Sequence, residues 1–246
     1  MKTNLICALL FIALGCSENK NFENIPCSPS DRSENDNLKQ IFKPCRKYIY
    51  QAKYWDENYN LISDENISMM ATGIDWEHQP ESQDQIVIQY GFNKDLIDKI
   101  DKYNINSQLK QSWKHKTTTG IIENGNTTWM HPFRQNQYIF TEIAPFPSVN
   151  FPLETGKTWE SNLNIYEGWG DWSDTEIKNQ YEVIGKDSVQ LSIGSLEAWH
   201  VSSIGYAQFG NSYHDFWYNN NYGFVKMIIK NYKNQLLKFE LIEVIE

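Results

Sequence analysis

The chain has 246 residues, and its 31 acidic and 22 basic side chains give a net charge of −9 and a pI near 5.1. An acidic chain without a lysine–arginine run lacks the positive surface that binds nucleic acids, so no nucleic-acid partner is expected. Its 9 Trp, 14 Tyr and 12 Phe residues favour pleated sheets over helices, and the length suits one sizeable core in a single all-β domain.

The first sixteen residues have the pattern of an export signal. Lys2 and the free amine are followed by an uncharged apolar run, residues 5–14, and Gly15 then precedes Cys16. The run is too short to span a bilayer, which is typical of a secretory signal peptide. The Gly-Cys ending resembles a bacterial lipoprotein signal. That resemblance implies cleavage before Cys16, a diacylglycerol on its sulfur and acylation of the new amine.

Two alternatives to acylation remain: ordinary cleavage that leaves a free Cys16, and an uncleaved membrane anchor. Ala13 and Leu14 stand where lipoprotein signals usually carry leucine and a small residue. We expect acylation, which would hold the chain on a membrane because each buried methylene contributes about 0.8 kcal/mol. The expected location is therefore the bacterial cell envelope, on the outer membrane. The predicted organisation is a signal peptide (1–15), an acylated cysteine with a flexible tether (16–45) and a β-rich domain (46–246).

Four cysteines occur in the chain, and two of them remain for other roles. Cys7 leaves with the signal and Cys16 is the predicted acyl acceptor, so Cys27 and Cys45 are left. In an exported chain such a pair predicts one disulfide, which would contribute about 3 kcal/mol by the chain-entropy model. The alternative is two unpaired thiols, or a bridge that forms only under stress. Two isolated cysteines are not expected to bind a metal.

In the N-terminal half of the domain, the spacing of apolar residues predicts strands and one short helix. Alternating apolar residues indicate strands over 48–54, 67–73 and 86–90. Leu96, Ile97 and Ile100 recur at helical spacing, which predicts a helix over 93–103 that begins at Asn93. Asn124-Gly125 is a strong signal for a hairpin turn, and strands are predicted on either side of it, at 116–123 and 127–130.

The C-terminal half predicts a longer series of strands. One is expected over 138–143, before Pro145, Pro147 and Pro152, and another over 176–184 that ends at Gly185-Lys186-Asp187. The other predicted strands cover 157–166, 189–193, 196–206, 213–218, 224–229 and 236–245. This pattern predicts an all-β fold with a minor helix: a single-domain antiparallel meander curled into a half-barrel or open barrel.

Four ordered segments carry a family resemblance. They are Phe151–Trp159, with Pro-Leu-Glu-Thr-Gly-Lys-Thr-Trp, Tyr181–Val189, the hairpin segment Gly194–Val201, and Gly223-Phe224-Val225-Lys226. In this order they resemble the antiparallel β half-barrel of DUF3108-like and related bacterial envelope proteins, and the chain as a whole resembles Bacteroidetes-type envelope lipoproteins. The resemblance covers the C-terminal half, and Ile193 stands where the family usually has proline. It implies no catalytic residues, because the family has none assigned.

The residues that usually carry catalysis or metal binding do not form a recognisable motif. The five histidines lack zinc-ligand spacing, and we expect each of them at the surface: His78, His115, His131, His200 and His214. His214 and Asp215 are neighbours on a strand and should point to opposite faces. No serine-nucleophile elbow, phosphate-binding loop or dinucleotide fingerprint is present, so we predict no catalytic residue, cofactor or metal.

The loop around Trp169 and Trp172 is the most distinctive local feature. Two tryptophans among glycines and acids would suit stacking on a sugar ring or contact with an apolar ligand. The alternative is that both rings pack over an open end of the barrel, which we favour because large aromatic side chains are usually buried.

Three functions are compatible with these patterns. The leading hypothesis is a lipid-anchored, non-catalytic envelope protein that binds a hydrophobic or glycan ligand in its concave face, or another envelope protein. The first alternative is a glycan-active hydrolase that uses acidic residues near Trp169 and Trp172. The second alternative is a purely structural or assembly lipoprotein.

Overall fold

The computed structural model describes Cys27, residues 41–100 and residues 112–246. The predicted signal peptide, the acylation site Cys16 and most of the predicted tether lie outside the described residues. The described strands are β1 (Lys47–Trp55), β2 (Leu61–Asp75), β3 (Asp84–Tyr90), β4 (Lys116–Glu123), β5 (Thr127–Met130), β6 (Ser148–Asn150), β7 (Thr158–Ile165), β8 (Thr175–Leu191), β9 (Gly194–Ala207), β10 (Gly210–Asn219), β11 (Gly223–Lys230) and β12 (Leu236–Ile245). The helical elements are α1 (Lys94–Ile100), η3 (Asn136–Ile143) and η4 (Gly170–Trp172).

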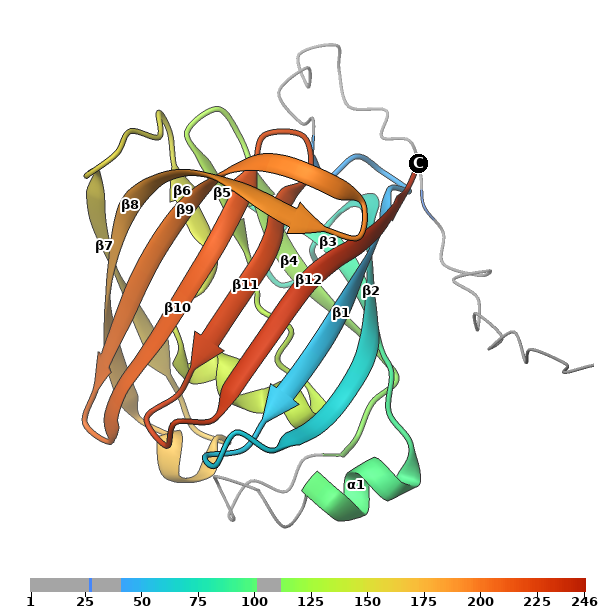
Figure 1. Cartoon of the computed structure of the whole chain (residues 1–246), viewed down its shortest axis with the longest axis vertical. Helices are drawn as coiled ribbons and strands as arrows, with labels where there is room; N and C mark the ends of the chain where they lie inside the picture. The colour runs from blue at the N-terminus through green and yellow to red at the C-terminus, as the bar shows by residue number, and fades with distance from the viewer. Residues whose placement is uncertain (1–26, 28–40, 101–111) are drawn as a thin grey trace, which may run out of the picture.

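The strands form one antiparallel sheet that rolls into a nearly closed barrel (Figure 1). Its order is β6-β5-β4-β3-β2-β1-β12-β11-β10-β9-β8-β7, so every step along each half is a pairing between consecutive strands. The two halves meet where β1 pairs with β12, from Lys47 opposite Ile245 to Trp55 opposite Leu236. The free edges are β6 and β7, which follow each other in the chain. The all-β fold and the antiparallel meander predicted from the sequence are confirmed.

Strand β8 packs one face on the core and then bends at a β-bulge. Thr175, Ile177, Asn179, Tyr181 and Val183 are buried, and the residues between them are exposed. The register then shifts between Val183 and Gly185, where φ is +155°. This bulge inserts an extra residue and bends the strand without ending it. The prediction that the strand ends at Gly185-Lys186-Asp187 is therefore wrong, and the strand predicted at 189–193 is largely its continuation.

The strand predicted over 138–143 is also wrong. These residues belong to the 3₁₀-helix η3, which lies inside the barrel (Figure 1). Seven of the eight residues in η3 are buried, so its side chains face protein on almost every side. Without an exposed face, the sequence carries no alternation that distinguishes a short buried strand from a short buried helix. We refer to residues 133–147, which contain η3, as the internal segment.

The short helix was predicted correctly at its start. The Asn93 side-chain Oδ1 accepts a hydrogen bond from the Leu96 backbone N–H at 2.8 Å, which is an N-cap contact, and α1 begins at Lys94. Leu96 and Ile100 are buried against the barrel, as the helical spacing requires. The last three residues of the predicted helix lie outside the described residues.

The folded body extends further toward the N-terminus than the sequence indicated. Ile41 and Phe42 fall within the predicted tether, yet only 3% and 4% of their surfaces are exposed. Two apolar side chains among polar residues are too short a pattern to distinguish a segment packed on the barrel from a linker. Their burial makes residues 41–46 part of one end of the barrel.

Candidate functional site

The interior of the barrel is occupied by the chain's own internal segment. The Phe133 ring lies 5.2 Å from both Tyr50 of β1 and Phe239 of β12, measured between ring centroids. Tyr138 contacts Phe239 at 5.5 Å and stacks with Tyr90 of β3 at 6.1 Å. The inward-facing side chains that would contact a ligand in the concave face therefore contact this segment.

Side chains of β8 and β10, on the other half of the barrel, contact the backbone carbonyl groups of the internal segment. Ser212 Oγ of β10 donates to the Ile143 carbonyl at 2.8 Å, and Tyr181 of β8 donates its hydroxyl to the Phe146 carbonyl at 3.1 Å. His214 Nδ1 lies 2.7 Å from the Pro145 carbonyl oxygen. A carbonyl only accepts hydrogen bonds, so this nitrogen carries the proton of a neutral imidazole. These three contacts satisfy backbone groups that have no partner in a strand.

His214 is buried rather than exposed, which corrects the expectation of a surface histidine. Its side chain is completely buried, and burial lowers its pKa to about 4. Nε2 has no hydrogen-bond partner among the described residues, so a second proton there would lack an acceptor. As the strand alternation predicted, the neighbouring Asp215 points to the outer face, where it contacts His200.

An ion pair with a buried carboxylate lies within the internal segment. Arg134 Nη1 donates to the two carboxylate oxygens of Glu142 at 3.0 and 3.1 Å. Burial raises the pKa of Glu142 above its ordinary value, and the charge and hydrogen bonds of Arg134 offset part of that rise. Because both partners belong to the internal segment, the pair links two parts of that segment, with the Glu142 carboxylate buried and the Arg134 side chain 24% exposed.

The outer face carries a polar and aromatic cluster around His200. His200 Nε2 lies 3.1 Å from Asp215, Nδ1 lies 3.5 Å from Asp187, and the ring stacks on Trp217 at 4.5 Å. Trp217 donates its indole N–H to Asp187 at 2.9 Å, and the ammonium of Lys226 sits 4.7 Å from the Trp217 ring. The contacts tie together β8, β9, β10 and β11 after the β8 bulge. The imidazole of His200 and the ammonium of Lys226, from the strands on either side of β10, both contact the Trp217 ring.

A groove of about 500 Å³ lies beside this cluster on strands β7 to β10. The side chains of Ile184 and Tyr213 on its wall are 46% and 45% exposed. Gln180 donates to Glu160 at 3.1 Å and accepts a hydrogen bond from Tyr206 at 3.3 Å, so part of the polar rim is already ordered. The groove is lined by Thr158, Trp159, Glu160, Gln180, Tyr181, Glu182, Ile184, Ser202, Ser203, Ile204 and Tyr213. Sequence patterns could not indicate it, because its side chains come together only through strand pairing.

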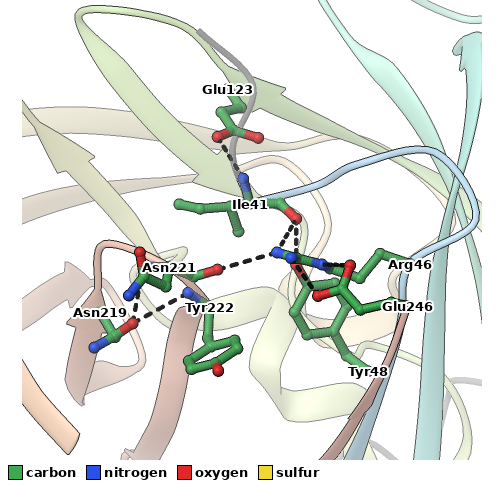
Figure 2. A network of polar contacts seen from close by, with 8 residues as sticks. All are labelled: Ile41, Arg46, Tyr48, Glu123, Asn219, Asn221, Tyr222 and Glu246. Atoms are coloured by element: carbon green, nitrogen blue, oxygen red, sulfur yellow. Dashed lines mark hydrogen bonds and ion pairs between the residues drawn. The ribbon is translucent and has the colours of Figure 1, made fainter. Parts of the chain in front are cut away.

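The N-terminal segment is fixed to one end of the barrel by a buried carboxylate (Figure 2). The two oxygens of Glu123, at the end of β4, accept the backbone N–H groups of Ile41 and Phe42 at 2.9 and 2.8 Å. A carboxylate that accepts two N–H groups makes charge-assisted hydrogen bonds, which are stronger than neutral ones. Gly223 leaves room for this segment, because a Cβ there would lie 2.9 Å from Cγ2 of Ile41.

Arg46 belongs to the same network of polar contacts and also binds Ile41 (Figure 2). Its guanidinium donates to the carbonyls of Ile41 and Asn221, both at 3.1 Å, and to the Glu246 carboxylate. The Tyr48 hydroxyl also donates to the Ile41 carbonyl. Arg46 is only 6% exposed, so its charge is held inside protein by these acceptors. We call the contacts of Glu123, Arg46 and Tyr48 with Ile41 and Phe42 the N-terminal clasp.

Cys27 and Cys45 form a disulfide in the structure, with their Cα atoms 5.3 Å apart. Cys45 immediately precedes Arg46 of the N-terminal clasp and lies two residues before the start of β1. The bond therefore attaches Cys27 directly to the clasped end of the barrel.

The two tryptophans singled out in the sequence have different environments. Trp172 in η4 is completely buried, and its indole N–H faces the Tyr232 hydroxyl at 3.4 Å. Trp169 is partly buried and packs against the same core. A buried Trp172 ring has no free face for a sugar or an apolar ligand, so these positions agree with the packing interpretation.

Two further features concern ions and membranes. Among the described residues, His, Cys, Asp and Glu side chains form no cluster of three or more arranged to bind a metal ion. Within the same part of the chain, the helices are too short or too polar to cross a bilayer.

Comparison with known proteins shows similarity of fold. No family model matches the sequence, and none of the curated proteins is significantly similar to it. A crystal structure of a lipoprotein candidate from Parabacteroides distasonis has a TM-score of 0.51 at 13% identity, covering 83% of this chain and 97% of that one. An exported-protein candidate with a YmcC-like fold from Bacteroides fragilis gives 0.46 at 12% identity, covering 82% and 95%. The hypothetical lipoprotein YmcC from Escherichia coli gives 0.37 at 5% identity, covering 85% and 91%.

The structure from Parabacteroides distasonis shares the overall fold of this chain over most of both chains. The DUF3108-like resemblance of the C-terminal half stays a prediction, because its four segments find no matching family model. At 13% identity the similarity shows the fold alone.

Proposed function

We propose that the chain is a lipid-anchored protein of the bacterial cell envelope, held in the outer membrane through Cys16, and that its barrel is a non-catalytic binding or assembly module. The export signal supports the address, and a lipoprotein candidate with the same fold is consistent with it. The single observation that carries the proposed role is the internal segment. Because the internal segment occupies the concave face, a partner would bind to the outer surface of the barrel.

The groove on β7 to β10 is the part of that surface best suited to a partner. Ile184 and Tyr213 expose apolar surface there, and Glu160 and Glu182 add carboxylates at its wall. Exposed apolar side chains surrounded by polar ones are typical of protein contact surfaces. We therefore favour another envelope protein over a hydrophobic or glycan ligand in the concave face.

Photo-crosslinking in living cells tests this role. Replacing Tyr213 with p-benzoylphenylalanine is expected to give one discrete higher-mass adduct in the outer-membrane fraction, since the side chain is 45% exposed at the groove. The matched control is the same replacement at Tyr59, which is 63% exposed in the turn before β2 and does not line the groove. Equal adducts at both positions, or none at Tyr213, would contradict a specific partner at the groove.

The alternative of a glycan-active hydrolase receives less support. It relied on Trp169 and Trp172 to stack on a sugar above a pair of carboxyl groups, and Trp172 is completely buried.

A further inference from the structure

The two free edges of the sheet differ in how they are protected. The edge strand β6 has three residues and lies between Pro147 and Pro152, which have no N–H group to donate. The carbonyl of Asn150, the last residue of β6, accepts a hydrogen bond from Lys157 Nζ at 2.7 Å. A short strand, flanking prolines and a lysine at the edge all hinder the pairing of a further strand. The β6 edge is therefore protected against a partner strand.

The edge strand β7 (Figure 1) has none of these protections. Its eight residues pair with β8 in one unbroken register and include neither proline nor lysine. The Lys157 carbonyl accepts the Val183 N–H at 2.9 Å, so the N–H and C=O groups of every second residue after Lys157 point to β8, and those between point away. The residues whose backbone groups point away are all exposed: Thr158, Glu160, Asn162 and Asn164. Such an edge is typical of a strand that pairs with another chain.

The side chains of β7 on the inner face of the sheet are incompletely covered. Ser161 shares that face with the buried Asn179 and Tyr181 of β8, and its hydroxyl lies 3.4 Å from the Tyr181 hydroxyl. Ser161 is nevertheless exposed, and Trp159 and Leu163 on the same face are only partly buried. The free side of β7 therefore leaves both backbone groups and apolar side chains accessible.

The sequence of β7 is symmetric in character about Ser161. Residues at equal distances on either side of Ser161 are of the same kind: Glu160 and Asn162 are polar, Trp159 and Leu163 are apolar, and Thr158 and Asn164 are polar. When two identical strands pair antiparallel with Ser161 at the centre, each residue lies opposite its counterpart. Apolar side chains then face apolar ones, and no two like charges lie opposite each other.

The neighbouring registers lose this match. Centring the pair on Glu160 places this carboxylate opposite the same carboxylate of the second copy, and like charges directly opposite each other destabilise a strand pair. Centring it on Asn162 places the apolar Leu163 opposite the polar Ser161. The register centred on Ser161 is therefore the one in which β7 complements a second β7.

We propose that a second copy of the chain binds to β7, and that the two β7 strands pair antiparallel across a two-fold axis at Ser161. Glu160 of each copy exchanges backbone hydrogen bonds with Asn162 of the other, and Trp159 of each copy faces Leu163 of the other. An interface with two-fold symmetry uses the same surface on both copies, which is the commonest arrangement in dimers. This inference goes beyond the proposed function and depends neither on the acylation of Cys16 nor on a partner at the groove.

Disulfide cross-linking of the full-length protein tests the position of the axis. At Ser161 the two strands form a pair without backbone hydrogen bonds, in which the Cα atoms lie about 4.5 Å apart, within the reach of a disulfide. Ser161→Cys is therefore expected to give, on mild oxidation, mainly a reducible species of twice the chain mass. Wild-type protein, in which Cys27 and Cys45 are bonded to each other, gives the background.

Asn162→Cys is the matched control for this cross-link. Asn162 is exposed on the same strand, but in this register it faces Glu160 of the second copy. The two Asn162 positions are then offset by two residues, which places their Cα atoms more than about 7 Å apart and out of disulfide reach. Absence of the dimer for Ser161→Cys, equal dimer for both variants, or an adduct with a different protein would overturn the inference.

Charge substitutions at Asn162 test the same register without a covalent bond. The side chain is exposed, so neither variant should affect folding. Asn162→Glu places a carboxylate opposite Glu160 at two symmetric positions and should raise the dissociation constant of the dimer by about 2- to 30-fold, whereas Asn162→Lys should lower it by a similar factor. Sedimentation equilibrium of the mature protein in detergent measures these constants. Equal constants for the two variants, or monomers throughout, would contradict the pairing of β7 with β7.

Discussion

Replacing Phe239 with alanine is expected to destabilise the protein by about 3 to 5 kcal/mol, the usual cost of removing a buried phenylalanine ring. Phe239 is 1% exposed and contacts both Phe133 and Tyr138 of the internal segment. The ring therefore joins β12 to the element that fills the barrel. In a domain of this size, the loss corresponds to a decrease in Tm of about 6 to 20 °C.

Urea unfolding measures this effect, and two variants make it interpretable. Phe239→Leu keeps most of the apolar volume and should cost less than about 1.5 kcal/mol, so it provides a value even if the alanine variant does not fold. Phe209→Ala removes a partly buried ring that contacts Tyr232 outside the internal segment, and it should cost less than Phe239→Ala. A loss below about 1 kcal/mol for Phe239→Ala would mean that the internal segment is not packed on β12.

Acid should destabilise the wild-type protein more than a variant without His214. The pKa of His214 is about 4 in the folded protein, below the ordinary value of 6.5. The unfolded state therefore binds more protons between these values, and stability falls as the pH decreases through that window. From pH 7 to pH 5 this group alone should remove about 2 kcal/mol. His131 acts in the same direction, because burial lowers its pKa to about 3.

His214→Asn isolates this contribution. The asparagine amide can donate to the Pro145 carbonyl in place of Nδ1, but it does not titrate in this range. The difference in unfolding free energy between pH 7 and pH 5 should therefore be smaller in the variant by about 2 kcal/mol. His78→Asn, at a side chain that is 68% exposed, should leave the difference unchanged. Identical pH dependence in wild type and His214→Asn would contradict a neutral, buried His214.

Local sequence patterns predicted most of the strands and a meander curled into a half-barrel or open barrel, but not the pairing of the first strand with the last. The bounds of β4, β5 and β12 agree with the prediction because alternation is clear there and Asn124-Gly125 marks the turn. The pairing of β1 with β12 joins residues almost two hundred positions apart, and no local pattern encodes such a contact. The sequence therefore predicted the curled meander, whereas the structure showed that β1 pairs with β12 and that the free edges are β6 and β7.

The internal segment and the N-terminal clasp were harder to predict. The internal segment lacks an exposed face, so its apolar residues resembled a strand. No local sequence pattern distinguishes Glu123 or Arg46, and only the fold brings both of them to Ile41. In each case the signal depends on burial, which a single sequence shows only when polar and apolar residues alternate.

Metabolic labelling with radioactive palmitate tests the anchored envelope protein most directly. Wild-type protein should incorporate the label and be recovered in the outer-membrane fraction. Cys16→Ser should incorporate none and be released with the soluble exported proteins, because the loss of the acyl chains removes the affinity for lipid. Unlabelled wild-type protein among the cytosolic proteins, or label retained by Cys16→Ser, would contradict the anchor and the function proposed for it.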